Sequence, residues 1–188
     1  MRRLFLTVLT LAIATLSSAG SLWAMPWGVD KGKSEITFSG VHAGAPFEGR
    51  FEDWTANIEF DPAAPENAVV LVTIQTASAK TGNSLYDGTL PGVDWFNVAT
   101  FPQARFEAFG AEADGSGNYV LNGKLTIRDH TVPVTVAFQA NDSEARADST
   151  VTLQRLDFGM GSESDPTGDW VSLEIPVTVK LIAHPSAK

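Results

Sequence analysis

Cysteine is absent from this sequence, and its absence limits both the fold and the chemistry. The chain can have no disulfide framework, no thiolate nucleophile and no sulfur-ligated metal, so its stability must come from a hydrophobic core. Positive charge is also scarce, because 13 Lys and Arg residues stand against 22 Asp and Glu residues. Such an excess of negative charge repels polyanions, and nucleic acid is therefore not expected as a partner.

Long hydrophobic runs are missing after the N-terminal segment. In that segment two arginines precede an apolar run over residues 4–16, and small and polar residues follow. This arrangement predicts a secretory signal peptide over residues 1–24, with cleavage after Ala24 and a cut near Ala19 as the alternative. The apolar run is too short to span a bilayer comfortably, and no later stretch approaches about 20 apolar residues. We therefore expect an exported protein with one domain over residues 25–188.

Residues 121–138 carry the clearest strand pattern, with an apolar alternation on each side of a short turn. The residues of the shared inner face are Leu121, Gly123, Leu125 and Ile127 on the first arm and Val132, Val134, Val136 and Phe138 on the second. In the turn, Asp129 suits a left-handed backbone because its short side chain can bond to neighbouring amides. The pattern predicts a half-buried antiparallel hairpin, which needs further strands to form a sheet.

Alternating segments elsewhere bring the expected number of strands to about eight. They cover residues 34–39, 47–60, 69–75, 103–112, 144–155 and 170–182. Residues 40–46 form a glycine-rich link, and the alternation changes phase at residues 52–53, which predicts a bulge or sharp bend. Because no helical segment has a periodic apolar stripe, these strands predict an all-β barrel or sandwich.

Residues 77–101 fit neither the strand period nor the helix period for long. We predict a long, partly helical connection, with Asn83 as a helix N-cap. Connections of this length in a compact domain are often functional. This one is expected to close one end of the barrel, either as a plain lid or as the gate for a ligand, with Leu85, Trp95 and Phe96 against the ligand or the rim.

Signatures of catalysis and of metal binding are missing from the sequence. It contains no G-x-S-x-G nucleophile motif, and its three histidines do not have the spacing of metal ligands. Glu163, Asp165 and Asp169 fit a solvated acidic loop better than a calcium site. We therefore expect a protein that is not an enzyme and that holds no metal.

Arg155 is the one charged residue that the strand pattern directs inward, because it continues the phase of Val151 and Leu153. A buried guanidinium needs an acceptor for its hydrogen bonds. That acceptor is either a carboxylate at the rim of the barrel or the polar head of a ligand, since the planar guanidinium suits an anionic or carbonyl group. The sequence pattern leaves both alternatives open.

Short motifs in a fixed order extend over the whole chain after the signal peptide. They are Trp27, Val29-Asp30, Ser34, Ile36, Phe38, His42, Gly44, Gly49, Phe51, Phe60-Asp61, Thr81-Gly82, Asp87, Leu90, Asp94-Trp95-Phe96, Phe101-Pro102, Phe106, residues 123–128, Thr131, Pro133-Val134, Arg155, Phe158-Gly159 and Val171. As an ordered set, they resemble the YceI-like family of exported lipid-binding proteins. The sequence departs from the family pattern at Lys33, where histidine is common, at Asp129, where glycine is usual, and at Tyr86, where an arginine often precedes the aspartate.

The resemblance implies an all-β, lipocalin-like, eight-stranded antiparallel barrel with a long partly helical connection. Its apolar interior would hold a long isoprenoid lipid, an isoprenoid quinone or a fatty-acid derivative, with no other cofactor. Family members are periplasmic and often dimeric, and some occur alongside membrane b-type cytochromes that react with quinones. The predicted ligand-binding residues are Phe38, Phe51, Leu85, Trp95, Phe96, Phe106, Leu125, Ile127, Val134, Val136, Phe138, Arg155, Phe158 and Leu173.

Three other functions stay open beside the lipid carrier or sensor. The protein could be an accessory partner of such a cytochrome without a ligand of its own, or a structural barrel with a filled core. An enzyme acting on a bound lipid is the third, and the missing acid-base and nucleophile motifs count against it.

Overall fold

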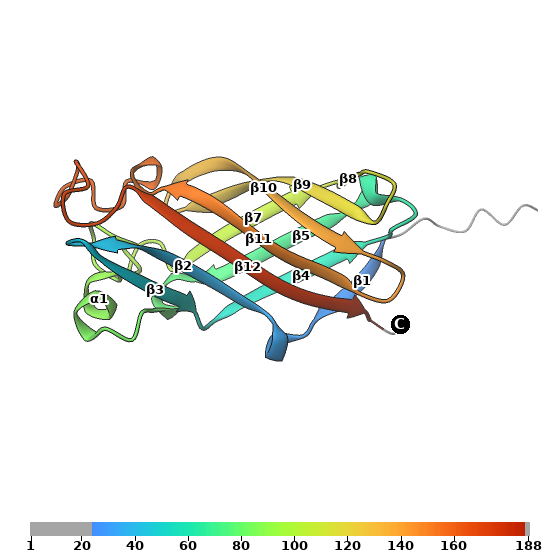
Figure 1. Ribbon diagram of the computed structural model, residues 1–188, viewed down its shortest axis with the longest axis horizontal. Helices are drawn as coiled ribbons and strands as arrows, with labels where there is room; N and C mark the ends of the chain where they lie inside the picture. The colour runs from blue at the N-terminus through green and yellow to red at the C-terminus, as the bar shows by residue number, and fades with distance from the viewer. Residues whose placement is uncertain (1–23, 187–188) are drawn as a thin grey trace, which may run out of the picture.

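Residues 24–186 are described by the computed structural model of the protein, and Figure 1 shows their strands wrapped around a common axis. The predicted signal peptide lies outside the described residues except for Ala24. The strands are β1 (Met25–Val29), β2 (Glu35–His42), β3 (Ala45–Phe51), β4 (Trp54–Phe60), β5 (Val69–Gln75), β6 (Ala79–Lys80), β7 (Gln103–Phe109), β8 (Glu112–Ala113), β9 (Asn118–Ile127), β10 (His130–Ala140), β11 (Ala145–Gln154) and β12 (Glu174–Pro185). The helices are α1 (Ser84–Thr89) and the 3₁₀ turns η1 (Lys31–Lys33), η2 (Pro65–Asn67), η3 (Thr76–Ser78) and η4 (Arg155–Phe158).

Eight strands close the barrel in the order β1, β4, β5, β7, β9, β10, β11 and β12. The ring closes because β1 pairs with β4 on one side and with β12 on the other, both antiparallel. This arrangement confirms the predicted lipocalin-like barrel. Within residues 24–186, no helix has the length and apolar character needed to cross a membrane.

The twelve-residue strand β12 pairs with two different strands along one of its edges. Residues 177–180 pair with β2, whereas residues 183–185 pair with β1. β2 then pairs with β3, and β3 with β6. These three strands therefore extend the barrel wall near the start of β12, at the opposite end from β1.

The predicted hairpin is the β9–β10 pair, and its inner face is the predicted one. Val136 lies opposite Leu121 and Val134 lies opposite Gly123, with the other inward residues in the same register. The left-handed position of the turn is Arg128, with a φ of 56°, and not Asp129 as predicted. The Arg128 side chain is anchored on the neighbouring loop, where its Nη1 donates to the carbonyl of Gly159 at 2.6 Å, and this contact favours the conformation.

Strand boundaries agree with the alternation except near turns. β5 has the predicted bounds, and the predicted phase change falls in the bend between β3 and β4. The glycine-rich link is shorter than predicted, because β2 and β3 form a hairpin around Ala43 and Gly44, both with positive φ. β1 was not predicted as a separate strand, and η1 separates it from β2, with Asp30 accepting from the Gly32 amide at 3.1 Å.

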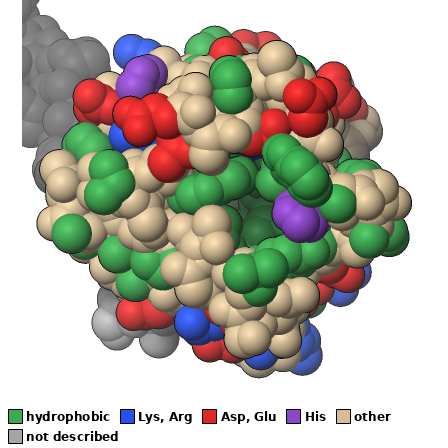
Figure 2. Space-filling model, turned by 90° about the vertical axis from the view of Figure 1, so that its left-hand side faces the viewer, with side chains coloured by type: hydrophobic (Ala, Val, Ile, Leu, Met, Phe, Trp, Pro, Cys, Tyr) green, Lys and Arg blue, Asp and Glu red, His purple; other side chains and the backbone are tan. Residues whose placement is uncertain are grey.

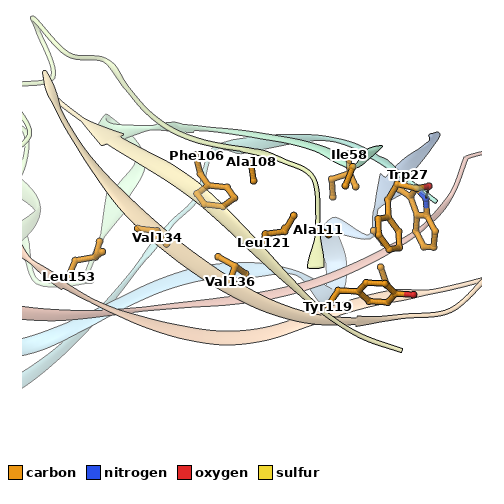
Figure 3. Close-up of a cluster of buried hydrophobic side chains, with 14 of the residues drawn as sticks. Trp27, Ile58, Phe106, Ala108, Ala111, Tyr119, Leu121, Val134, Val136 and Leu153 are labelled. Atoms are coloured by element: carbon orange, nitrogen blue, oxygen red, sulfur yellow. Dashed lines mark hydrogen bonds between the residues drawn. The ribbon is translucent and has the colours of Figure 1, made fainter. Parts of the chain in front are cut away.

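The two ends of the barrel differ in structure. At the closed end, which carries β1 and the C-terminus, the rings of Phe60, Tyr119 and Phe138 contact one another with centroids 5.1–5.3 Å apart. Trp27 joins this cluster edge-on to Phe60, and its indole donates to the Phe60 carbonyl at 2.8 Å. Figure 3 shows Trp27 and Tyr119 facing each other across this end. The aromatic cluster therefore seals the barrel.

The open end carries α1 and the loop over residues 159–172, here called the 159–172 loop (Figure 1). α1 lies in the predicted connection and begins at the predicted N-cap, since the Asn83 side chain accepts from the amides of Leu85 and Tyr86. Figure 2 looks onto this end and shows a central hollow surrounded by hydrophobic side chains, with acidic side chains further out.

Candidate ligand-binding lumen

Three adjoining cavities follow the barrel axis from the closed end to the open end. The inner cavity is about 140 Å³, the middle cavity about 120 Å³ and the mouth cavity about 180 Å³. Of the predicted residues, Phe106, Leu125, Val134, Val136 and Phe138 line the inner cavity; Phe38, Phe51, Trp95, Phe96, Leu125, Ile127, Arg155 and Phe158 line the middle one; Leu85 and Trp95 line the mouth. The structure thus brings 13 of the 14 predicted residues to this lumen.

The lumen has a waist, which the prediction of one elongated cavity did not include. The side chains that line both the inner and the middle cavity are Ile36, Ile74, Leu125, Leu153 and Val177. They come from five different strands and meet at one level of the barrel. Figure 3 shows other inward residues of the inner cavity, Phe106, Val134 and Val136, between this level and the aromatic cluster. The waist separates two compartments of one apolar lumen.

Leu173 is the predicted lumen residue that the structure places elsewhere. The chain bends at residue 173 and β12 begins only at Glu174, so the alternation of β12 does not extend back to Leu173. A Cβ atom added to Gly168 would lie 2.8 Å from Leu173 Cγ, which shows that Leu173 packs against the 159–172 loop. Leu173 is therefore not among the described residues that line the three cavities, contrary to the prediction, because the chain bends there before β12 begins.

Arg155 is buried at the open end of the middle cavity, with 3% of its surface exposed. Its Nη2 forms an ion pair with Asp165 Oδ2 at 2.8 Å and also donates to the Asp165 carbonyl at 2.6 Å and the Val171 carbonyl at 3.1 Å. Nη1 donates to the Met160 carbonyl at 2.8 Å and Nε to the Ser172 carbonyl at 3.3 Å. The guanidinium is thus satisfied by protein groups, which selects the rim carboxylate of the two alternatives.

Asp165 organises the 159–172 loop. Its carboxylate accepts from the amides of Asp169, Trp170 and Val171 in addition to Arg155. Burial alone would raise the pKa of Asp165, but the hydrogen bonds from the Val171 and Trp170 amides and the charge of Arg155 together lower it. The predicted solvated acidic loop is wrong for this residue, which is only 4% exposed, whereas the other two acidic residues of the loop are exposed.

Asp94 fastens the 77–101 connection to the same loop. Its carboxylate accepts from the Glu163 amide at 3.0 Å, from the Ser164 amide at 3.0 Å and from the Ser164 hydroxyl at 2.5 Å. Burial would raise the pKa of Asp94, but these hydrogen bonds outweigh it and lower the pKa. Residue spacing did not reveal this role, because the partners are about 70 positions away.

The mouth cavity has a polar pair on its wall that the sequence analysis missed. The hydroxyl of Tyr86 on α1 lies 3.0 Å from Nδ1 of His42 at the end of β2, and the ring centroids are 4.9 Å apart. Asp87 accepts from the Thr81 amide and hydroxyl at 2.7 and 2.8 Å, which holds α1 in place. Phe47 adds an edge-on aromatic contact to Tyr86 at 5.9 Å.

The described part of the chain shows no group of three or more His, Cys, Asp or Glu side chains suited to a metal ion. Within residues 24–186, the side chains that line the inner and middle cavities also include no Asp, Glu, His, Ser or Lys. The charged residues on that lining are Arg146 at the inner cavity and Arg155 at the middle one, and the guanidinium of Arg155 is satisfied by protein groups, so the lumen is a container for an apolar molecule.

A closed eight-stranded barrel with an apolar lumen defines a lipocalin-like class of protein. Residues 27–183 match the family model described as the YceI-like domain, so the chain belongs to this family. It is 30% identical over 153 residues to a UPF0312 protein of Shewanella baltica (strain OS185), covering 77% of this chain and 80% of the relative. It is also 30% identical over 177 residues to a UPF0312 protein of Pseudomonas savastanoi pv. phaseolicola, covering 88% and 92%.

Solved structures with the same fold include Burkholderia cenocepacia BcnA, with a TM-score of 0.75 and 29% identity over 82% of this chain and 99% of that one. A second is a domain from Saccharophagus degradans described as polyisoprenoid binding, with a TM-score of 0.67 and 14% identity over 86% and 99%. The second likeness concerns the fold alone.

Proposed function

We propose that the protein is an exported carrier or sensor that holds an isoprenoid lipid or an isoprenoid quinone in its lumen. The observation that carries this proposal is the apolar lumen, which is sealed at one end by aromatic rings and reaches the surface at the other. The fold-level likeness to a polyisoprenoid-binding domain supports it. Binding, and not catalysis, is favoured because the described lining of the inner and middle cavities holds no nucleophile or acid-base pair.

The physical chemistry of the lumen favours a hydrocarbon ligand. Apolar cavities of about 150 Å³ remain free of water and accept apolar molecules such as benzene. Each buried CH₂ contributes about 0.8 kcal/mol, so roughly ten buried carbons approach the 8 kcal/mol of a micromolar complex before ordering costs. A prenyl chain passing through the waist would contact both compartments.

Export to the periplasm follows from the predicted signal peptide and is part of the proposal. Partnership with a membrane b-type cytochrome and formation of a homodimer stay predictions from the family resemblance. Each concerns the surface of the barrel, whereas the carrier function concerns its lumen.

Organic extraction of the purified protein followed by mass spectrometry tests the carrier function. We expect a lipid with a prenyl chain, in a constant ratio to folded protein. The Val177→Phe variant should reduce this ratio at least fivefold, because Val177 lines both compartments at the waist and a phenyl ring would block the passage. A wild-type protein that contains no lipid and takes up none from prenyl-lipid micelles would be a structural barrel.

The matched control is Thr178→Phe, one residue further along β12. Thr178 faces outward, where its hydroxyl lies 2.8 Å from the Thr150 hydroxyl. This variant adds a similar bulk outside the lumen, so the lipid ratio should stay at the wild-type value. Equal losses in both variants would mean that general damage to β12, and not the waist, lowers occupancy.

A further inference from the structure

Prenyl lipids end in a polar head group, and the apolar lumen does not show where that head group would bind. Arg155 is the nearest charged candidate, but its hydrogen bonds already go to Asp165 and to backbone carbonyls. Arg128 donates to the carbonyl of Gly159 and keeps a buried Nε without a partner among the described residues, but it is not among the residues that line the three cavities. A head group therefore has to bind further out, in the mouth cavity.

The mouth cavity is continuous with the middle cavity, because Phe47, Leu90, Trp95 and Val171 line both. A chain that fills the lumen therefore emerges between these side chains. The polar side chains that it meets there are those of His42, Tyr86 and two threonines, and the described lining contains no lysine or arginine.

We propose that Tyr86 and His42 form the head-group site and that it takes an uncharged, oxygen-bearing head, best a phenol or quinone ring, in preference to a phosphate. The proposal rests on the proposed function, because it requires the lumen to hold the tail. It assigns a role to Tyr86, one of the three positions where the sequence departs from the family pattern.

The hydrogen-bonding chemistry of the pair supports an oxygen acceptor on the ligand. A neutral imidazole has one donor nitrogen and one acceptor nitrogen, and a phenol hydroxyl can donate once while it accepts. If Tyr86 donates to His42 Nδ1, the Nε2–H of His42 is left as a donor. If Nδ1–H donates to Tyr86, the hydroxyl proton of Tyr86 is left instead. The described chain offers the His42 ring no other hydrogen-bond partner, so in both tautomers one donor is available to a ligand oxygen.

The shape and charge of the mouth separate the two classes of head group. The rings of Phe47, Tyr86 and Trp95 form apolar walls that suit a flat conjugated ring. A phosphate would lose its hydration there without gaining a positive partner, which is costly. The net charge of −9 adds a long-range repulsion of anions.

The site is tested by measuring the affinity of the delipidated full-length protein for four probes at pH 8. The probes are farnesol, farnesyl phosphate, the hydrocarbon farnesane, which has no head group, and a benzoquinone with two isoprene units. Wild-type protein should bind farnesol and the quinone at least tenfold more tightly than farnesyl phosphate. Tyr86→Phe combined with His42→Phe removes the free donor of either tautomer and should weaken quinone binding about fivefold, the effect of one neutral hydrogen bond. The same variant should leave farnesane binding unchanged.

Two further variants complete the test. Tyr119→Phe removes a hydroxyl at the closed end and should change no affinity, since Tyr119 lies in the aromatic cluster. Tyr86→Arg introduces a positive charge at the mouth and should reverse the preference in favour of farnesyl phosphate. Equal binding of farnesol and farnesyl phosphate, unaffected by both Tyr86 variants, would overturn the head-group site while leaving the carrier function intact. Failure of all four probes, farnesane included, would instead overturn the carrier function itself.

Discussion

The closed end and the open end of this barrel are stabilised by opposite means. The closed end is held by contacts among Trp27, Phe60, Tyr119 and Phe138, and the strands β4 and β12 meet there on β1. The open end is held by buried polar groups, because its loops contain backbone amides and carbonyls that lack ladder partners. Arg155, Asp165 and Asp94 supply those partners.

The difference explains how one small barrel can be both stable and hollow. Apolar packing fills the space that it stabilises, so it would remove the lumen if it were used at both ends. Hydrogen bonds to loop backbones instead fix the rim around an opening. We therefore expect substitutions at the two ends to separate loss of stability from loss of ligand.

Arg155→Ala should have the largest effect at the open end. It leaves the buried Asp165 carboxylate without its positive partner, and breaking a buried pair in this way typically costs about 3–5 kcal/mol of the free energy of unfolding. Denaturant unfolding measures this loss, and lipid per folded molecule should change little. If stability is retained but lipid is lost, Arg155 binds the ligand and does not stabilise the rim of the barrel.

Arg50→Ala is the control for this prediction. Arg50 pairs with Glu52 at the same 2.7–2.8 Å separation as the Arg155 pair, but its side chain is 64% exposed. Exposed pairs contribute at most about 1 kcal/mol. A loss as large as that of Arg155→Ala would mean that arginine removal destabilises the barrel irrespective of burial.

Trp95→Ala should have a smaller effect on stability and a larger one on the ligand. Trp95 is half-buried, so we expect the free energy of unfolding to fall by about 2 kcal/mol, less than the 3–5 kcal/mol typical of a buried aromatic side chain. Because Trp95 lines both the middle and the mouth cavity, bound lipid per folded molecule should fall at least fivefold. Phe60→Ala at the closed end is its counterpart. Phe60 is 2% exposed, so its truncation should lower the free energy of unfolding by the full 3–5 kcal/mol. It should lower lipid occupancy less than Trp95→Ala does.

Unfolding midpoints and lipid per folded molecule on the same samples decide between these outcomes. If Trp95→Ala lowers stability more than occupancy, the 77–101 connection is only a core plug. Phe60 and Phe138 also line the inner cavity, so if Phe60→Ala lowers occupancy more than stability, the aromatic cluster contributes to ligand binding as well as to the seal.

Much of the barrel wall could be predicted because alternation is a local property of the sequence. The bounds of β5, the inner face of β9 and β10 and the N-cap at Asn83 all follow from residues close together in the chain. The short strand β1 was missed because its role is to join β4 and β12, which lie far along the sequence. Ring closure is a tertiary contact, and five residues carry too little pattern to reveal it.

The candidate site could be predicted in its apolar part but not in its polar part. Inward strand positions identify the lumen residues, whereas Tyr86 and His42 are 44 positions apart and on different elements. Leu173 was misplaced for a related reason, since the hydrogen bonds around Asp165 bend the chain before β12 begins. Loop hydrogen bonding of this kind has no period that a sequence reading can detect.

Acidification should give the smallest effect and should act on the open end first. The pKa values of Asp94 and Asp165 are lowered from the ordinary 3.8 in the folded protein, so the folded state favours their charged forms. Their contribution to stability is therefore complete above about pH 3.8 and is lost as the pH falls towards the lowered values. Lipid should be released in this range before the barrel unfolds.

Asp94→Asn sharpens this test, because the amide keeps the shape of the carboxylate but does not titrate. The slope of unfolding free energy against pH between 4.5 and 3 should become shallower in this variant, since one carboxylate that takes up a proton on unfolding has been removed. A parallel release of lipid and loss of the barrel, measured by tryptophan fluorescence and lipid quantification on one titration, would mean that the two ends unfold as one unit. Release ahead of unfolding, already increased at neutral pH in Asp94→Asn because an amide NH₂ cannot accept from the Glu163 and Ser164 donors, would place the weak point of the rim at the contact between the 77–101 connection and the 159–172 loop.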